Sequence, residues 1–219
     1  INFRFNSKTY QKLILEILKS DNKYGSSLGK KKKYNIEFVS ANPTGPMHIG
    51  HSRGAIYGDV LANLLKFNGN TVTKEYYIND YGNQIVNFTE SVFFRLREIK
   101  FSEKFINKEN LYPGDYVVDI AKKILIEDPG ISLDNFEKIF PTLSEMSLKY
   151  SMILIKDDLI SLGISHDNFV SEKFLVKKDL VTKSIKHLQD KKFVEEGYLN
   201  PPKGEDIKNF IKNKRLIFK

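Results

Sequence analysis

A strand, a helix and a second strand follow one another between residues 36 and 78, and this order constrains the fold more than any other feature of the chain. Residues 36–39 have the apolar character of a buried strand, and residues 71–78 are rich in β-branched and aromatic side chains. Between them, apolar side chains recur every four positions in two adjacent rows: Ile56, Val60 and Leu64, and Tyr57, Leu61 and Leu65. We therefore predict a helix over about residues 48–67, a right-handed crossover and a parallel sheet, which together make an α/β fold of the Rossmann type.

The sequence after residue 82 changes to a mostly helical pattern. Apolar residues at helical spacing predict four helices, over residues 85–99, 116–126, 143–162 and 180–188. Residues 193–199 have the pattern of a small hairpin, and residues 215–219 that of a further strand. Near the other end of the chain, residues 10–18 form the apolar face of an amphipathic helix with Ser7 as its N-cap.

Composition excludes several classes of protein. There is no cysteine among the 219 residues, which rules out disulfide frameworks, thiolate zinc sites and cysteine nucleophiles. No apolar run approaches the roughly 18 residues that a membrane span requires, so a span is excluded. The absence of cysteine fits a cytoplasmic protein, which we predict. Residues 1–33 hold nine Lys or Arg against two acidic residues, and so carry +7 of the formal net charge of +8. Such a segment either meets phosphates or forms a solvated linker, and both interpretations stay open.

The turn between the first strand and the helix has the residues best suited to chemistry. Ligands of an open parallel sheet bind beyond the carboxyl ends of its strands, where residues 40–51 are expected to lie. His48 and His51 flank Gly50 at the helix start, so two imidazoles join the free N–H groups and the positive dipole end of the helix. Gly50 has no Cβ, which leaves room for a flat base on the backbone. The pattern favours a phosphate site for attack on an α-phosphate; the other interpretation is that the histidines only cap the helix.

These residues also carry a resemblance to a known family. The sequence His48-Ile49-Gly50-His51 after a first strand resembles the signature of the class I aminoacyl-tRNA synthetases. The longer run over residues 37–51 resembles the arginine-specific branch of that class, as does the run over residues 76–84. The similarity continues more weakly at residues 112–116 and 162–167, and it covers most of the chain. It implies the class I synthetase catalytic fold, a Rossmann-type parallel sheet with a mostly helical insertion.

The resemblance implies an arginine–tRNA ligase, which activates L-arginine with ATP as arginyl-adenylate and transfers the arginine to tRNA-Arg. Catalytic roles are implied for His48, Gly50 and His51. ATP binding is implied for Pro46, Met47, His48, Gly50 and His51, and arginine binding for Glu37, Ser40, Ala41, Asn42 and His51. The expected cofactor is ATP with Mg²⁺ as its counter-ion, without a protein-bound metal. The expected partners are L-arginine, ATP and tRNA-Arg but no membrane, and the full-length protein is expected to be a monomer.

Glu37 is open to two interpretations. On an edge strand its carboxylate would simply face solvent. On a central, buried strand an unpaired carboxylate costs on the order of several kcal/mol, so a partner such as the arginine guanidinium is expected. A carboxylate suits a guanidinium because the two can form paired hydrogen bonds. We predict the central position and hence the arginine-binding role.

The resemblance also shapes the predicted domain organisation. Residues 1–33 are expected to be the end of a preceding N-terminal domain plus a linker, and residues 34–90 the first half of the nucleotide-binding catalytic domain. Residues 91–219 are expected to be a mostly helical connective insertion and the start of the next strand. The chain has no second, lysine-rich signature of the class, and the slot of a substitute lysine upstream of the histidines holds Gly45. We interpret the chain as a piece of a longer protein that is inactive alone.

Two alternatives remain beside this interpretation. One is another nucleotidyltransferase, because such enzymes share a His-x-Gly-His turn on a related fold. That class would lack the run over residues 37–42 and the long helical insertion. The other is a synthetase-derived module that binds RNA without catalysis.

Overall fold

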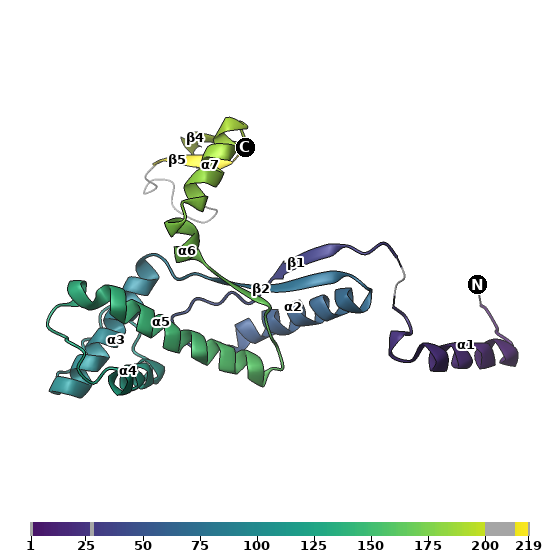
Figure 1. Cartoon of the computed structure of the whole chain (residues 1–219), viewed down its shortest axis with the longest axis horizontal. Coiled ribbons are helices and arrows are strands. Elements are labelled where there is room, and N and C mark those ends of the chain that lie inside the picture. Colours follow the sequence, from purple (N-terminus) through teal and green to yellow (C-terminus); the bar gives the residue numbers. More distant parts are fainter. Residues whose placement is uncertain (1, 27–28, 200–212, 219) are drawn as a thin grey trace. The chain divides into compact units, whose positions relative to one another are not determined.

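The computed structural model describes residues 2–26, 29–199 and 213–218, which fall into two compact units, Ile1–Val170 and Ser171–Lys219. The first unit contains α1 (Ser7–Ser20), the short 3-10 helix η1 (Asp21–Lys23), β1 (Lys33–Glu37), α2 (Ile49–Phe67), β2 (Thr71–Ile78), α3 (Asn83–Phe101), α4 (Asp115–Glu127) and α5 (Phe136–Ser161) (Figure 1). It also contains β3 (Asn168–Ser171) except for its last residue, Ser171, with which the second unit begins. The second unit contains α6 (Glu172–Lys177), α7 (Leu180–Asp190), β4 (Val194–Tyr198) and β5 (Lys214–Phe218). None of the helices in these described ranges is both long and apolar enough to span a membrane.

The sheet confirms the predicted α/β fold with parallel strands. Its strand order is β1-β2-β3, and β1 pairs with β2 in parallel, from Lys33 opposite Thr71 to Glu37 opposite Glu75. The strand β1 ends at Glu37 rather than at the predicted Val39, because Val39 and Ser40 have φ values of 68° and 40°. Such left-handed conformations cannot continue a strand. The chain therefore turns out of the sheet directly before the residues of interest.

The order of the strands corrects the expected position of Glu37. Among the described strands β1 lies at an edge of the sheet and β2 at its centre. Strand β3 was not predicted, because four residues with the sequence Asn-Phe-Val-Ser give too short a pattern. The predicted hairpin over residues 193–199 is also wrong: these residues include the single strand β4, which pairs antiparallel with β5. Asn6, and not Ser7, is the N-cap of α1, since its side chain accepts a hydrogen bond from the Thr9 N–H at 3.0 Å.

Helix α2 packs on the sheet through its smallest residues. Ala55, Gly58 and Ala62 are its buried positions. The apolar rows that predicted the helix are mostly exposed; the exposed members are Ile56, Tyr57, Val60, Leu61 and Leu64. A Cβ added at Gly58 would lie 2.3 Å from Cγ of Phe38, so the missing side chain sets how closely the helix approaches the strand end.

Two apolar clusters hold the first unit together, and α5 contributes to both. Helices α3, α4 and α5 contact one another around the first cluster, which includes Phe88, Ile120 and Leu143 (Figure 1). The second cluster joins α2, the strands and the far end of α5, where Ile155 and Leu159 are buried. Since α5 begins at Phe136, seven residues before the predicted start, it is long enough to link the helical segment to the sheet.

His166 packs against aromatic rings of the second apolar cluster. Its ring centroid is 4.3 Å from that of Phe38 and 5.3 Å from that of Tyr76. Both ring nitrogens are buried, and neither makes a hydrogen bond of normal geometry to the part of the chain that the structure describes. Burial therefore lowers the pKa of His166 below its ordinary value of 6.5.

We predict that His166→Phe stabilises the protein and reduces its sensitivity to acid. The variant removes two buried ring nitrogens that make no hydrogen bond of normal geometry within the described residues, which should add about 1 kcal/mol to the free energy of unfolding at neutral pH. In the wild type, the unfolded chain takes up a proton on His166 near pH 6.5 while the folded chain resists it, so stability falls as the pH drops below that value. Urea unfolding at pH 7.5 and pH 5.5 measures both effects. Equal losses of stability in variant and wild type between these two pH values would contradict the prediction.

Candidate functional site

The two signature histidines lie at the N-terminus of α2, as the sequence predicts. His48 is the N-cap in extended conformation, and its Nδ1 accepts a hydrogen bond from the Gly50 N–H at 3.1 Å. The backbone N–H of His48 in turn donates to Nδ1 of His51 at 3.3 Å. The two rings stack with their centroids 3.7 Å apart. The capping interpretation is therefore correct for the Nδ1 atoms of both rings.

This capping leaves the other nitrogen of each ring available for a ligand. Because each Nδ1 accepts a hydrogen bond, the proton of a neutral ring is on Nε2. No hydrogen bond to either Nε2 is formed within the described residues. Burial, followed by the charge of His48, lowers the pKa of His51, which favours its neutral form. The pair thus offers two Nε2–H donors beside the positive end of a helix dipole.

The structure explains why residue 50 is glycine. A Cβ at this position would come within 2.9 Å of Cε1 of His48. The absence of a side chain therefore makes room for the His48 ring in its capping conformation. The room for a base on the Gly50 backbone, which the sequence suggests, stays a prediction.

Three hydrogen bonds hold the signature turn, residues 40–48: two come from strand β2 and one from Asn79, which directly follows the strand. The buried Tyr76 hydroxyl donates to the Ala41 carbonyl at 2.9 Å. Ser40 Oγ accepts from the Tyr77 N–H at 3.1 Å, and Asn79 Nδ2 donates to Asn42 Oδ1 at 3.2 Å. Burial raises the pKa of Tyr76, so its phenol remains a donor.

Two further contacts reach the signature turn from the helical segment, and sequence reasoning assigned no role to either. The Tyr116 hydroxyl at the start of α4 donates to the Thr44 carbonyl at 3.0 Å. Asp158 near the end of α5 accepts a hydrogen bond from the Met47 N–H at 2.9 Å. The family-like run over residues 112–116 was a signal for Tyr116. Asp158 had no such signal, because a carboxylate on an amphipathic helix normally faces solvent.

A cavity of about 440 Å³ opens beside the two histidines. Its lining consists of Asn42, Thr44, Gly45, Pro46, Met47, His48, His51, Tyr112 and Tyr116. The structure therefore brings together Asn42, Pro46, Met47, His48 and His51 of the predicted site residues. Glu37, Ser40, Ala41 and Gly50 are not part of this lining.

Glu37 differs from its expected surroundings. It is exposed, at the end of the edge strand β1, and not buried on a central strand. Its carboxylate accepts a hydrogen bond from the Ser40 hydroxyl. Because Ser40 also accepts from β2, this bond connects Glu37 to the signature turn. The carboxylate is thus oriented by a neighbour while one side of it faces solvent.

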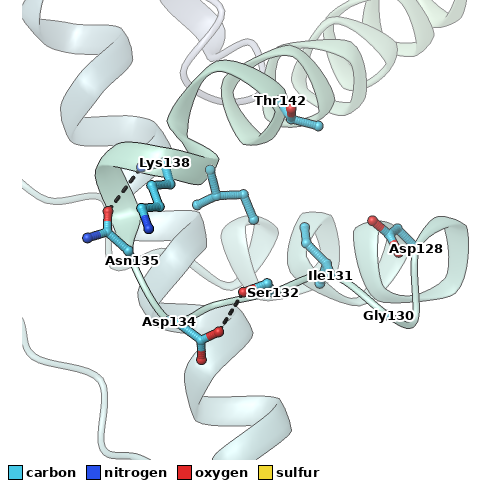
Figure 2. A pocket seen from close by; sticks show the side chains of 9 residues that line it. Asp128, Gly130, Ile131, Ser132, Asp134, Asn135, Lys138 and Thr142 are labelled. Atoms are coloured by element: carbon cyan, nitrogen blue, oxygen red, sulfur yellow. Dashed lines mark hydrogen bonds between the residues drawn. The ribbon is translucent and has the colours of Figure 1, made fainter.

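A second cavity of about 440 Å³ lies where α4 connects to α5 (Figure 2). Its polar side chains serve local structure: Ser132 donates to Asp134 at 2.8 Å, and Asn135 caps α5 by accepting from the Lys138 N–H at 3.0 Å. None of the predicted site residues lines this cavity. The candidate site is therefore the cavity at the start of α2.

Comparison with known proteins gives a consistent result. Residues 13–111 match the family described as tRNA synthetases class I (R), catalytic domain. The whole chain is 50% identical to the arginine–tRNA ligase of Pelagibacter ubique, of which it covers 38%. A solved Campylobacter jejuni protein, provisionally named an arginyl-tRNA synthetase, matches 89% of this chain with a TM-score of 0.79 and 31% identity, over 43% of its own length. The Thermus thermophilus arginyl-tRNA synthetase shares the fold, with a TM-score of 0.55 and 20% identity over 90% of this chain and 32% of its own.

The parallel sheet and the histidine pair at the start of α2 define the catalytic fold of a class I aminoacyl-tRNA synthetase. Within that class, the chain is similar to the arginyl-tRNA synthetases, both over residues 13–111 and across its full length. It spans about two fifths of the length of the curated relative described above.

Proposed function

We propose that this chain supplies the ATP-binding side of an arginine–tRNA ligase active site. In the first step the carboxylate of L-arginine attacks the α-phosphorus of ATP, which forms arginyl-adenylate and releases pyrophosphate. In the second step a ribose hydroxyl at the 3′ end of tRNA-Arg attacks the activated carbonyl, and AMP leaves. The observation that carries the proposal is the pair of Nε2–H donors of His48 and His51 at one wall of the cavity.

The roles of the site residues follow from where charge develops. Negative charge grows on the phosphoryl oxygens in the first step, and donors fixed before the reaction lower its barrier. Nε2–H of His48 and Nε2–H of His51 serve as these donors, with Pro46 and Met47 as the adjoining wall of the ATP site. Mg²⁺ accompanies ATP as its counter-ion. The N-terminus of α2 adds a positive dipole end, which favours the same anion.

The arginine is proposed to lie between the signature turn and the end of β1. Asn42 lines the cavity with His51 and offers its amide to the ammonium or carboxylate of the amino acid. The Glu37 carboxylate binds the cationic part of arginine, and a hydrogen bond from the Ser40 hydroxyl orients this carboxylate. Ala41 contributes its backbone, whose carbonyl is fixed by Tyr76.

We predict that Glu37→Gln in the intact protein weakens arginine binding by about 1.5–3 kcal/mol, the contribution of a hydrogen bond to a charged group. Titration calorimetry with L-arginine measures the change directly. The control is Glu90→Gln on α3, which also removes a carboxylate, one paired with Lys108 away from the cavity. If Glu37→Gln bound arginine as tightly as the Glu90 variant, Glu37 would not be a ligand of the amino acid.

The function itself is tested by ATP–pyrophosphate exchange with the intact protein and tRNA, using each of the twenty amino acids in turn. Exchange that depends on arginine is the expected result. Adenylyl transfer to an acceptor other than an amino acid would favour the nucleotidyltransferase alternative. Binding of tRNA without exchange with any amino acid would favour a non-catalytic RNA-binding module, and either outcome would overturn the proposal.

A further inference from the structure

We propose that Tyr116 and Asp158 are positioning residues, through which the helical segment holds the signature turn so that both histidine donors stay aimed at the phosphate. The inference rests on the proposed function for the identity of the ligand. The contacts themselves are seen directly: one bond fixes the Thr44 carbonyl and the other the Met47 N–H, on either side of residues 45 and 46.

Tyr116 is fitted closely to its place. A Cβ at Gly45 would lie 3.0 Å from Cζ of the ring, and a Cβ at Gly114 would lie 2.6 Å from Cε1. Two glycines thus make room for one ring, which fixes its position and directs the hydroxyl to the Thr44 carbonyl. Burial raises the pKa of Tyr116 to about 12, so the hydroxyl remains a donor at any physiological pH.

The fit of Tyr116 also explains why Gly45 is glycine in this chain. The resemblance described above places the slot of a substitute lysine at this position. Here the Tyr116 ring occupies the space into which any side chain at position 45 would extend. The turn is therefore built around the tyrosine, and a lysine at position 45 requires the ring to move.

Asp158 provides the second anchor from a rigid element. Its neighbours on α5, Ile155 and Leu159, are buried in the apolar cluster that joins the helix to the sheet. The carboxylate accepts from the Met47 N–H at 2.9 Å, and such charge-assisted bonds are stronger than neutral ones. Met47 directly precedes His48, so this bond fixes the backbone immediately before the helix cap.

Loss of either anchor is expected to slow catalysis rather than to weaken arginine binding. Donors to a developing oxyanion act within about 2.7–3.1 Å, so a small shift of the signature turn reduces transition-state stabilisation. Neither the Tyr116 hydroxyl nor the Asp158 carboxylate is assigned to a substrate, since each is bonded to the turn. Loss of either should therefore lower kcat and leave KM for arginine nearly unchanged.

Four variants of the intact protein test the proposal. In arginine-dependent ATP–pyrophosphate exchange, we expect Tyr116→Phe to lower kcat about 3- to 10-fold and Asp158→Ala about 10- to 100-fold. Asp158→Asn should recover most of the activity, because an amide oxygen still accepts from Met47. The control is Tyr150→Phe, which removes a hydroxyl bonded to Glu127 at 2.6 Å, between α4 and α5 and away from the cavity.

Hydrogen exchange of the backbone provides a second readout that needs no activity. Exchange over residues 44–51 should quicken in Tyr116→Phe and Asp158→Ala but not in Asp158→Asn or Tyr150→Phe, while the amides of β2 stay protected in all four variants. If the unmodified protein showed no arginine-dependent exchange of pyrophosphate, the proposed function would fail, and hydrogen exchange would still decide whether the turn is held. The inference is overturned by unchanged hydrogen exchange over residues 44–51, by wild-type kcat in both Tyr116→Phe and Asp158→Ala, or by an Asp158→Asn protein as impaired as Asp158→Ala.

Discussion

Replacing His48 with alanine is expected to lower kcat for arginine-dependent ATP–pyrophosphate exchange by about 100- to 1,000-fold in the intact protein, with little change in KM for arginine. This is the typical effect of removing one preorganised donor to a developing oxyanion. The Nε2–H of His48 matters chiefly in the transition state, because its hydrogen bond strengthens as negative charge grows on the phosphoryl oxygens. Steady-state kinetics with arginine and ATP varied separately measures both constants.

Two further variants distinguish the donor from the helix cap. His48→Asn keeps a side-chain acceptor for the Gly50 N–H, but its amide does not extend to the position of Nε2. The kcat of His48→Asn should therefore be as low as that of His48→Ala, although the N-terminus of α2 is still capped. His187→Ala removes an exposed histidine of α7 and should leave the rate unchanged. A His48→Asn protein with wild-type kcat would show that capping is the only role of this residue.

The largest expected effect on stability is that of Gly58→Ala. Alanine is favoured over glycine in helices by about 1 kcal/mol, yet we expect the free energy of unfolding to fall by about 1–3 kcal/mol through overpacking. The reason is that the new Cβ would lie 2.3 Å from Cγ of Phe38, so the helix and the end of β1 must separate. Urea denaturation of the intact protein, followed by circular dichroism, gives the change.

Gly54→Ala is the matched control in the same helix. A Cβ at Gly54 would meet no atom within 4 Å, so only helix propensity changes and stability should rise by about 0.5–1 kcal/mol. The two substitutions are chemically identical and four residues apart. A Gly58 variant as stable as the Gly54 variant would contradict the close packing of α2 on Phe38.

The sequence predicted those parts of the fold whose signals are local. Helix α2 begins at Ile49 after the cap His48, and β2 spans Thr71–Ile78, both as predicted. These boundaries follow from turn residues, a capping position and β-branched composition, each of which acts within a few residues. The parallel pairing of β1 with β2 followed from the length of the crossover between them.

The features that were missed depend on contacts distant in sequence. Helix α2 is buried through the small residues Ala55, Gly58 and Ala62, whereas periodicity alone pointed to its large apolar rows. At Gly58 the reason is the Phe38 side chain, which leaves no room for a Cβ. Strand β3 exists through pairing with the sheet and not through its own four residues.

The site residues also separate into those with a local sequence signal and those that depend on distant contacts. Asn42, His48 and His51 lie within ten residues of one another, so a motif finds them. Tyr116 and Asp158 bond to the signature turn across 72 and 111 residues of chain, and only folding brings them there. Glu37 was identified from its place before the motif, but its exposure on an edge strand depends on the order of strands, which the sequence did not reveal.

The central claim is that the two Nε2–H groups at the start of α2 bind the phosphate that links arginine to adenosine. The most direct measurement is a crystal structure of the intact protein with an unreactive analogue of arginyl-adenylate. We predict Nε2 of His48 and Nε2 of His51 within about 3.1 Å of the oxygens of the phosphate-like group, with the arginine part of the analogue at Asn42 and Glu37. An analogue whose phosphate-like group lies away from both histidines, or whose guanidinium and ammonium groups lie away from Asn42 and Glu37, would contradict it.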